Sequence, residues 1–143
     1  MTYETIILAA AKAAKISGTV LLAICTHETG LKNVTVQYDG GSPSIGICQV
    51  KLETAKMLGY NGNQKGLEDV EVNAKWAGAY LKYQYNRYGH NWCQAVAAYN
   101  AGKYNESKSA RGCPRNLKYV RHVQEKVAVY MKPQLSCNRA ENP

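Results

Sequence analysis

The chain has 143 residues, and its 18 Lys and Arg against 10 Asp and Glu give it a formal net charge of +8. Hydrophobic residues make up 45% and charged residues 20%, which excludes a disordered or collagen-like chain. Surface scaling for this length predicts that about two thirds of the unfolded surface is buried, enough for one domain with a real core. The positive charge favours a polyanionic partner, whether nucleic acid, membrane or cell wall.

Neither a membrane-spanning segment nor a secretory leader is predicted. The apolar stretches Ile6–Ala11 and Val20–Cys25 are far shorter than the roughly 18 residues that a spanning helix needs. A signal peptide is not expected, because Glu4 rather than a basic residue precedes the first stretch and Lys12 interrupts it. We therefore expect a chain without a transmembrane segment.

Apolar residues at helical spacing predict a chain built mostly of helices. Gly30 suits the left-handed position that ends the second of them. The predicted helices are, in chain order, Thr2–Ile16, Val20–Glu28, Lys51–Leu58, Val70–Tyr88, Trp92–Tyr99 and a last one, capped by Asn116, that runs to about Met131.

Three stretches are predicted to be non-helical. Leu31–Val50 contains Asp39-Gly40-Gly41 and Pro43 and indicates a loop with a short β-hairpin. Tyr60–Gly66 indicates a turn, and the polar segment Pro133–Pro143 indicates a tail. We therefore expect an all-α-dominated single domain over residues 1–132, with about six helices and a small irregular β-like region at residues 31–50.

The cysteines favour a reduced chain. Their odd number and the lack of a CxxC pair exclude a full disulfide framework, leave one or two bridges open and favour mostly buried thiols. Metal binding is disfavoured, because Leu31 stands where the second histidine of an HExxH motif from His27 would stand. A metal site with His90 and Cys93, or a cysteine nucleophile with a histidine base, has no local signature. The cysteines are Cys25, Cys48, Cys93, Cys113 and Cys137.

Glu28 is the carboxylate with the most unusual position. It follows the apolar run Val20–Cys25 and falls in the last turn of a predicted helix, where the helix dipole carries partial negative charge. The dipole and any burial both raise the pKa of a carboxyl group. A carboxylic acid that stays protonated near neutral pH is what a general acid needs, although most surface glutamates are merely solvated. Glu28 is therefore the candidate catalyst.

Three further motifs say little about function when each is taken alone. Gly46-Ile47-Cys48-Gln49 alone indicates a loop packed on the core, Ala98-Tyr99-Asn100-Ala101-Gly102 a helix end, and Tyr119 a half-buried tyrosine. In order after Glu28-Thr29-Gly30, they resemble the catalytic domain of soluble lytic transglycosylases. That lysozyme-like, peptidoglycan-cleaving family has the pattern Glu-Ser/Thr-Gly, Gly-Leu-Met-Gln, Ala-Tyr-Asn-x-Gly and a later Tyr. Over roughly Ile6 to Tyr130, the resemblance also includes Asn73 and Ala79-Tyr80-Leu81 as the family's central helix.

The resemblance implies a set of site residues and an α+β lysozyme-like fold. Glu28 corresponds to the family's single catalytic acid and base, and Tyr119 to the tyrosine whose hydroxyl lies near that carboxylate. Cys48 stands where the family usually has Met, so a shorter side chain there changes the contact with the bound sugar. The residues that correspond to the glycan cleft are Ser44, Gly46, Cys48, Gln49, Tyr99 and Asn100.

The implied activity is that of a peptidoglycan lytic transglycosylase. Glu28 would protonate the β-1,4 bond between N-acetylmuramic acid and N-acetylglucosamine and then deprotonate the muramyl 6-hydroxyl, which closes a 1,6-anhydro ring. No metal or cofactor is needed, and a monomer is expected. Goose-type lysozymes, which are similar in fold, hydrolyse the bond with an acidic residue before the Gly-Leu-Met-Gln segment. Asp39 could take that role and leaves this muramidase alternative open, although Asp39-Gly40 favours a plain turn.

A basic nucleic-acid-binding module is the rival class. Residues 103–126 carry seven basic side chains against Glu106 and Glu125. The favoured interpretation is the rim of a cleft for the anionic wall polymer, with peptidoglycan strands rather than nucleic acid as partner. Because the wall lies outside the cytoplasm and no leader is seen, we expect a bacteriophage protein delivered in a virion or through a holin, or a mature fragment of a secretion-system enzyme. The basic residues are Lys103, Lys108, Arg111, Arg115, Lys118, Arg121 and Lys126.

Overall fold

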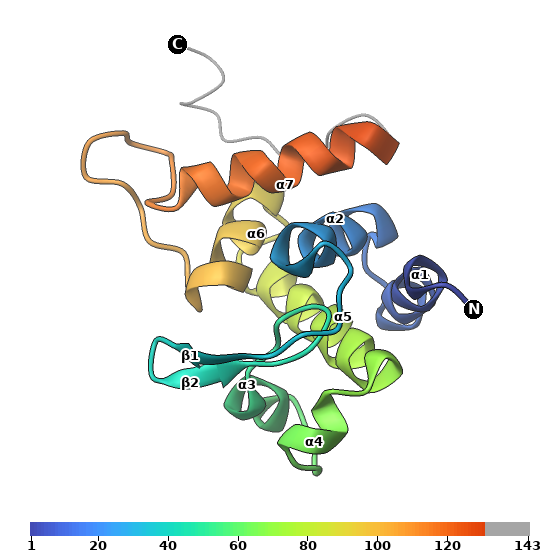
Figure 1. Ribbon diagram of the computed structural model, residues 1–143. Coiled ribbons are helices and arrows are strands. Elements are labelled where there is room, and N and C mark those ends of the chain that lie inside the picture. The colour runs from blue at the N-terminus through green and yellow to red at the C-terminus, as the bar shows by residue number, and fades with distance from the viewer. Residues whose placement is uncertain (131–143) are drawn as a thin grey trace. The chain divides into compact units, whose positions relative to one another are not determined.

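The computed structural model describes residues 1–130 (Figure 1). The chain groups into two compact units, Met1–Lys82 and the residues from Tyr83 onward. Helix α5 (Val70–Arg87) begins in the first unit and ends in the second. The expected tail at residues 133–143 and the expected helix end at Met131 lie outside the described residues.

The first unit begins with two capped helices that pack on each other. In α1 (Tyr3–Ala14), the Thr2 side chain accepts a hydrogen bond from the Thr5 backbone N–H at 3.0 Å. Ser17 caps α2 (Gly18–Thr29) in the same way, and Gly30 ends it at a φ of +66°. Both helices confirm the sequence prediction. The stretch from Val20 to Cys25 is fully or almost fully buried, whereas the last turn of α2, from Thr26 to Thr29, is half-buried at the edge of the core.

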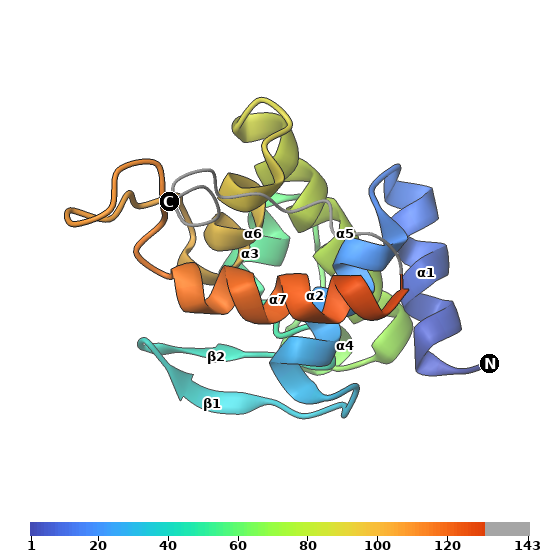
Figure 2. The ribbon, with the colours of Figure 1, turned by 90° about the horizontal axis from the view of Figure 1, so that it is seen from above.

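A short hairpin follows α2. Strands β1 (Val36–Asp39) and β2 (Ser42–Ser44) pair antiparallel, as predicted, with Val36 opposite Ser44 and Asp39 opposite Ser42. Gly40 and Gly41 form the turn with positive φ angles, which glycine adopts without steric cost. Figure 2 shows the two strands side by side.

The rest of the first unit is helical and holds one element that the sequence did not predict. Helix α3 (Leu52–Met57) confirms the short helix, but the expected turn at residues 60–66 runs into α4 (Gln64–Leu67). This helix forms because the Asn63 side chain accepts a hydrogen bond from the Gly66 N–H at 2.9 Å. The part of the chain that the structure describes therefore has seven helices.

Helix α5 is the central helix of the first unit. A Cβ at Gly78 would lie 3.3 Å from the Ala10 carbonyl oxygen and 3.6 Å from Leu21 Cδ2, so α5 packs closely against both α1 and α2 there. Its buried face also carries Asn73 and Leu81, both fully buried. The predicted span is confirmed, and α5 thereby gives the core a polar side chain at Asn73.

The second unit contains α6 (Trp92–Ala101) and α7 (Leu117–Tyr130), which are in contact. Gly102, at a φ of +87°, ends α6, and a loop leads from there to α7 (Figure 2). The buried Gln84 of α5 donates hydrogen bonds from Nε2 to the carbonyl oxygens of Ala98 and Gly102, which holds the end of α6. The helix-dominated class with one small sheet is confirmed.

Candidate functional site

Glu28 lies half-buried in the last turn of α2. Thr29, the next residue, donates from its hydroxyl to the Ile47 carbonyl oxygen at 2.8 Å and to the Cys25 carbonyl oxygen at 3.3 Å. Cys25, three residues before Glu28, is bonded to Cys48 by a disulfide with a Cα–Cα distance of 4.3 Å. A hydrogen bond and a disulfide therefore link the helix end that carries Glu28 to residues 47 and 48.

Residues 45–50 form a tight buried loop. Ile45 and Val50 exchange two backbone hydrogen bonds of 2.9 and 3.0 Å, and Ile45–Cys48 are all buried. Gln49 closes the loop at a φ of +56°, a left-handed conformation that costs a non-glycine residue on the order of 1 kcal/mol. Its side-chain Nε2 donates to the Gly46 and Val34 carbonyl oxygens at 2.9 and 3.0 Å. These bonds give the Gln49 side chain a defined orientation.

Asn73 holds this loop from the side of α5. Its Nδ2 donates to the carbonyl oxygens of Ile45 at 2.7 Å and Leu67 at 2.9 Å, and its Oδ1 accepts from the Cys48 N–H at 2.9 Å. A Cβ at Gly46 would lie 2.5 Å from Asn73 Nδ2, so only glycine fits there. The sequence assigned Asn73 to the central helix without a role. The signal that could have revealed one is an asparagine on an otherwise apolar helix face.

The expectation of reduced thiols is wrong for three cysteines. Cys25 and Cys48 are bonded to each other, and Cys93 is also disulfide-bonded, whereas Cys113 is a free, buried thiol. Cys25 and Cys48 are separated by 23 positions in the sequence, and the segment between them contains the hairpin that returns the chain to the end of α2, a return that the spacing alone does not encode. The resemblance implied a short Cys48 side chain that changes the contact with the sugar. In the structure Cys48 is instead fully buried and bonded to Cys25.

Asp39 and Ser44 belong to the hairpin. The Ser44 hydroxyl donates to Asp39 Oδ2 at 2.6 Å, and Lys51 Nζ donates to the Asp39 backbone carbonyl. Asp39 is exposed and immediately precedes the Gly40–Gly41 turn, so the favoured turn interpretation agrees with the structure. Its carboxylate also orients Ser44, which sequence reasoning did not anticipate.

The other predicted site residues lie in the second unit. Tyr99 is buried and Asn100 exposed in the last turn of α6, and Tyr119 is half-buried in the first turn of α7. The Asn116 side chain donates from Nδ2 to the Ala97 carbonyl oxygen and to Asn100 Oδ1, both at 2.9 Å. Asn116, predicted only as a helix cap, therefore orients the Asn100 amide.

The structure thus gathers the predicted residues into two groups. Glu28 joins the residues of the hairpin and of the 45–50 loop in the first unit, and the α6 and α7 residues form the second group in the other unit.

The basic segment at residues 103–126 is largely exposed, with Lys126 half-buried and its other six basic residues exposed. The Tyr104 backbone N–H donates to the Tyr88 hydroxyl at 2.7 Å, which anchors the start of the loop. Burial raises the pKa of the Tyr104 hydroxyl, and the charge and hydrogen bond of Glu106 raise it further, so Tyr104 stays neutral at physiological pH.

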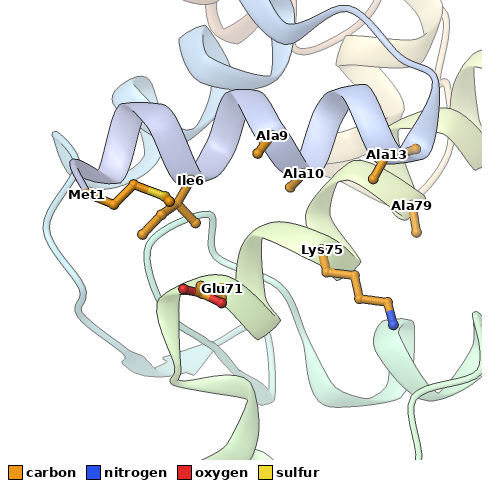
Figure 3. A pocket seen from close by; sticks show the side chains of 9 residues that line it. Met1, Ile6, Ala9, Ala10, Ala13, Glu71, Lys75 and Ala79 are labelled. Atoms are coloured by element: carbon orange, nitrogen blue, oxygen red, sulfur yellow. The ribbon is translucent and has the colours of Figure 1, made fainter.

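A groove of about 470 Å³ lies between α1 and α5 in the first unit (Figure 3). Alanine side chains of α1, among them Ala9, Ala10 and Ala13, face Lys75 and Glu71 across it, and no predicted site residue lines it. Within residues 1–130, His, Cys, Asp and Glu side chains form no group of three or more that could hold a metal ion. The helices of this part of the chain include none with the length and apolar character of a membrane span.

Residues 5–119 match the family described as the transglycosylase SLT domain, and the chain therefore belongs to that family. The matched range includes every predicted site residue, from Glu28 to Tyr119.

Solved structures of lytic transglycosylases have the same fold. The chain is similar to an inactive mutant of Slt from Pseudomonas aeruginosa, with 18% identity and a TM-score of 0.74 over 92% of this chain and 25% of that one. It is also similar to the 70 kDa soluble lytic transglycosylase of Escherichia coli, with 22% identity and a TM-score of 0.61 over 90% of this chain and 19% of that one. A bulgecin A complex of a 70 kDa soluble lytic transglycosylase matches at 26% identity and a TM-score of 0.60, over 88% and 19% of the two chains. The chain thus spans a quarter or less of these proteins.

Proposed function

We propose that this domain is a peptidoglycan lytic transglycosylase and that Glu28 is its general acid and then its general base. The observation that carries the proposal is that Glu28 lies in the last turn of α2, which a disulfide and a hydrogen bond link directly to the Gly46–Gln49 motif. Membership of the transglycosylase SLT family supports the same reaction class.

The proposed reaction needs one carboxyl group. The Glu28 carboxylic acid gives its proton to the glycosidic oxygen between N-acetylmuramic acid and N-acetylglucosamine, and the bond from that oxygen to the muramyl anomeric carbon breaks. The substrate's N-acetyl group stabilises the positive charge that develops at this carbon. The Glu28 carboxylate then takes the proton of the muramyl 6-hydroxyl as its oxygen attacks the same carbon. The acid is regenerated, and the products are a free 4-hydroxyl and a 1,6-anhydro ring.

The other site residues have binding and orienting roles in this proposal. Gln49, Tyr99 and Asn100 contact the glycan, and Tyr119 corresponds to the family's tyrosine that assists catalysis through its hydroxyl group. Ser44 and Gly46 shape one wall, and Cys48, which is fully buried in its disulfide, supports that wall rather than contacting the sugar. The hydrogen bonds that orient the Gln49 and Asn100 amides support this assignment, because pre-oriented amides lose little entropy when they bind sugar hydroxyls.

We also infer that the domain works outside the cytoplasm, on the bacterial wall and as a monomer. The Cys25–Cys48 disulfide supports this location, because disulfides persist in oxidising compartments. The exposed basic segment supports an anionic substrate, and the muramyl lactyl and stem-peptide carboxylates of peptidoglycan are anionic.

Mass spectrometry of digested peptidoglycan tests the proposal. We expect anhydromuropeptides, which are lighter than the hydrolytic products by one water. Reducing-end muropeptides would refute transglycosylation and favour the hydrolase. A salt-dependent gel shift without glycan cleavage would instead favour the nucleic-acid module.

A single isosteric substitution tests the role of Glu28. We expect Glu28→Gln to abolish turnover and leave the circular dichroism spectrum unchanged, because the amide keeps the shape of the side chain and loses the acid. Glu4→Gln, at an exposed position in the first turn of α1, is the matched control and should keep its activity. Residual activity of Glu28→Gln near that of the control would overturn the assignment.

A further inference from the structure

We propose that the Cys25–Cys48 disulfide positions the Glu28 carboxyl group, so that the catalytic rate depends on the oxidised state of this bond. The inference rests on the proposed function of Glu28. It concerns a bond between two fully buried cysteines in the core of the first unit.

The helical register supports this role. Cys25, Glu28 and Thr29 are spaced i, i+3 and i+4, so they share one face of α2. Cys25 is bonded to Cys48, and Thr29 donates to the Ile47 carbonyl oxygen at 2.8 Å. The face of α2 that carries Glu28 is therefore the face that meets the 45–50 loop.

The loop is held by two independent sets of contacts. Asn73 and the Ile45–Val50 backbone pair fix its shape and its place on α5. The disulfide and the Thr29 hydrogen bond fix its place on the end of α2. Loss of the disulfide leaves the first set and the Thr29 hydrogen bond intact but removes the covalent link between the end of α2 and the loop. The chain then still folds, but the relation between Glu28 and the loop is looser.

Chemical rate is sensitive to this kind of loosening. A displacement of about 1 Å of a catalytic group can cost about a hundredfold in rate, whereas contacts made by the rest of the glycan are unaffected. We therefore expect the broken tether to lower kcat about ten- to a hundredfold and to change KM for soluble peptidoglycan strands less than about twofold. If the disulfide had only a structural role, its loss would lower the fraction of folded enzyme and leave kcat per folded molecule unchanged.

The redox step is a thiol–disulfide exchange. A dithiol reductant gives two electrons and two protons to the Cys25–Cys48 bond, which becomes two thiols, while the reductant becomes a disulfide. The reverse exchange with a disulfide donor restores the bond and the rate. The domain would thus be slow in a reducing compartment and reach its full rate in an oxidising one.

Two variants and a reductant test the proposal. The variant Cys25→Ala/Cys48→Ala lacks both the disulfide bond and the volume of the two sulfur atoms. In Cys25→Ala/Cys48→Met, the methionine thioether fills the buried space of the disulfide but forms no covalent link. We expect the first variant to show the fall in kcat with a native circular dichroism spectrum. We expect the second to have an intermediate kcat that dithiothreitol does not change, whereas dithiothreitol lowers the kcat of the wild type reversibly.

The outcomes separate this inference from the proposed function. If the oxidised wild type does not cleave peptidoglycan, or Glu28→Gln remains active, the proposed function is wrong. If the wild type is active and Cys25→Ala/Cys48→Ala keeps its kcat, the positioning role is wrong. If the methionine variant is as sensitive to dithiothreitol as the wild type, the effect comes from the disulfide at Cys93, and the inference is likewise overturned.

Discussion

Asn73 is the residue whose substitution tests the architecture of the site most directly. It is fully buried, and Asn73→Ala removes three hydrogen bonds at once, to the Cys48 N–H and to the carbonyl oxygens of Ile45 and Leu67. Each such bond contributes about 0.5–1.5 kcal/mol net, and a buried partner left unsatisfied raises the cost to about 1–3 kcal/mol. We therefore expect a fall in the free energy of unfolding of about 3–5 kcal/mol.

This loss is large against the roughly 5–15 kcal/mol that holds a typical domain together. It would be measured by urea denaturation followed by circular dichroism, with the slope m compared between the variants. Asn63→Ala is the matched control, because it removes one exposed capping bond of 2.9 Å and should cost about 1 kcal/mol. A cost for Asn73→Ala no greater than that of the control would refute the view that these bonds hold the 45–50 loop.

Asn73→Asp distinguishes the contribution of the Oδ1 acceptor of Asn73 from that of its Nδ2 donor. The aspartate keeps an acceptor for the Cys48 N–H but turns a carboxylate oxygen toward two carbonyl oxygens. We expect it to be at least as destabilising as the alanine at neutral pH, since a buried charge without a donor is costly. Equal stability of the aspartate variant and the wild type would show that the Nδ2 bonds contribute little.

Three further substitutions address the neighbouring residues. Gly46→Ala should cost roughly 2–4 kcal/mol in urea denaturation, because its φ of +77° disfavours a side chain and its Cβ would collide with the Asn73 amide; a cost under about 1 kcal/mol would contradict this. Asn116→Ala should raise KM for soluble peptidoglycan strands several-fold with kcat little changed, since it releases the Asn100 amide; an unchanged KM would remove the orienting role. Asp39→Asn should still yield anhydromuropeptides in mass spectrometry, and loss of all activity would instead support the hydrolase.

The sequence predicted the fold where local signals decide it. Ser17 and Gly30 mark the ends of α2, and the Gly40–Gly41 pair marks the hairpin, because caps and positive-φ turns depend on a few adjacent residues. Helix α4 was not predicted, since four residues give too little periodicity and its Asn63 cap also suits a turn.

The identities of the candidate site residues were predictable from the sequence, but the hydrogen bonds between them were not. The order of motifs identified Glu28, Gln49 and Tyr119, but the bonds that orient the site connect positions far apart in the chain. Asn73 reaches Cys48 across 25 residues, and Asn116 reaches Asn100 across 16. Such pairings depend on how helices pack, and no local pattern encodes them. The disulfide was missed for the same reason.

The disulfide and the Asn73 hydrogen bonds both hold the 45–50 loop, but the first acts mainly on the unfolded state and the second on the folded state. A disulfide across a separation of 23 residues lowers the entropy of the unfolded chain, by about 3 kcal/mol in the loop-closure description. The Asn73 bonds exist only in the folded chain, where they satisfy buried groups that water cannot reach. The covalent link therefore adds stability and also connects α2 to the loop, whereas the amide adds stability and gives the loop its shape. Because the loop meets α2 on the face that carries Glu28, both contributions act on the geometry of one carboxyl group.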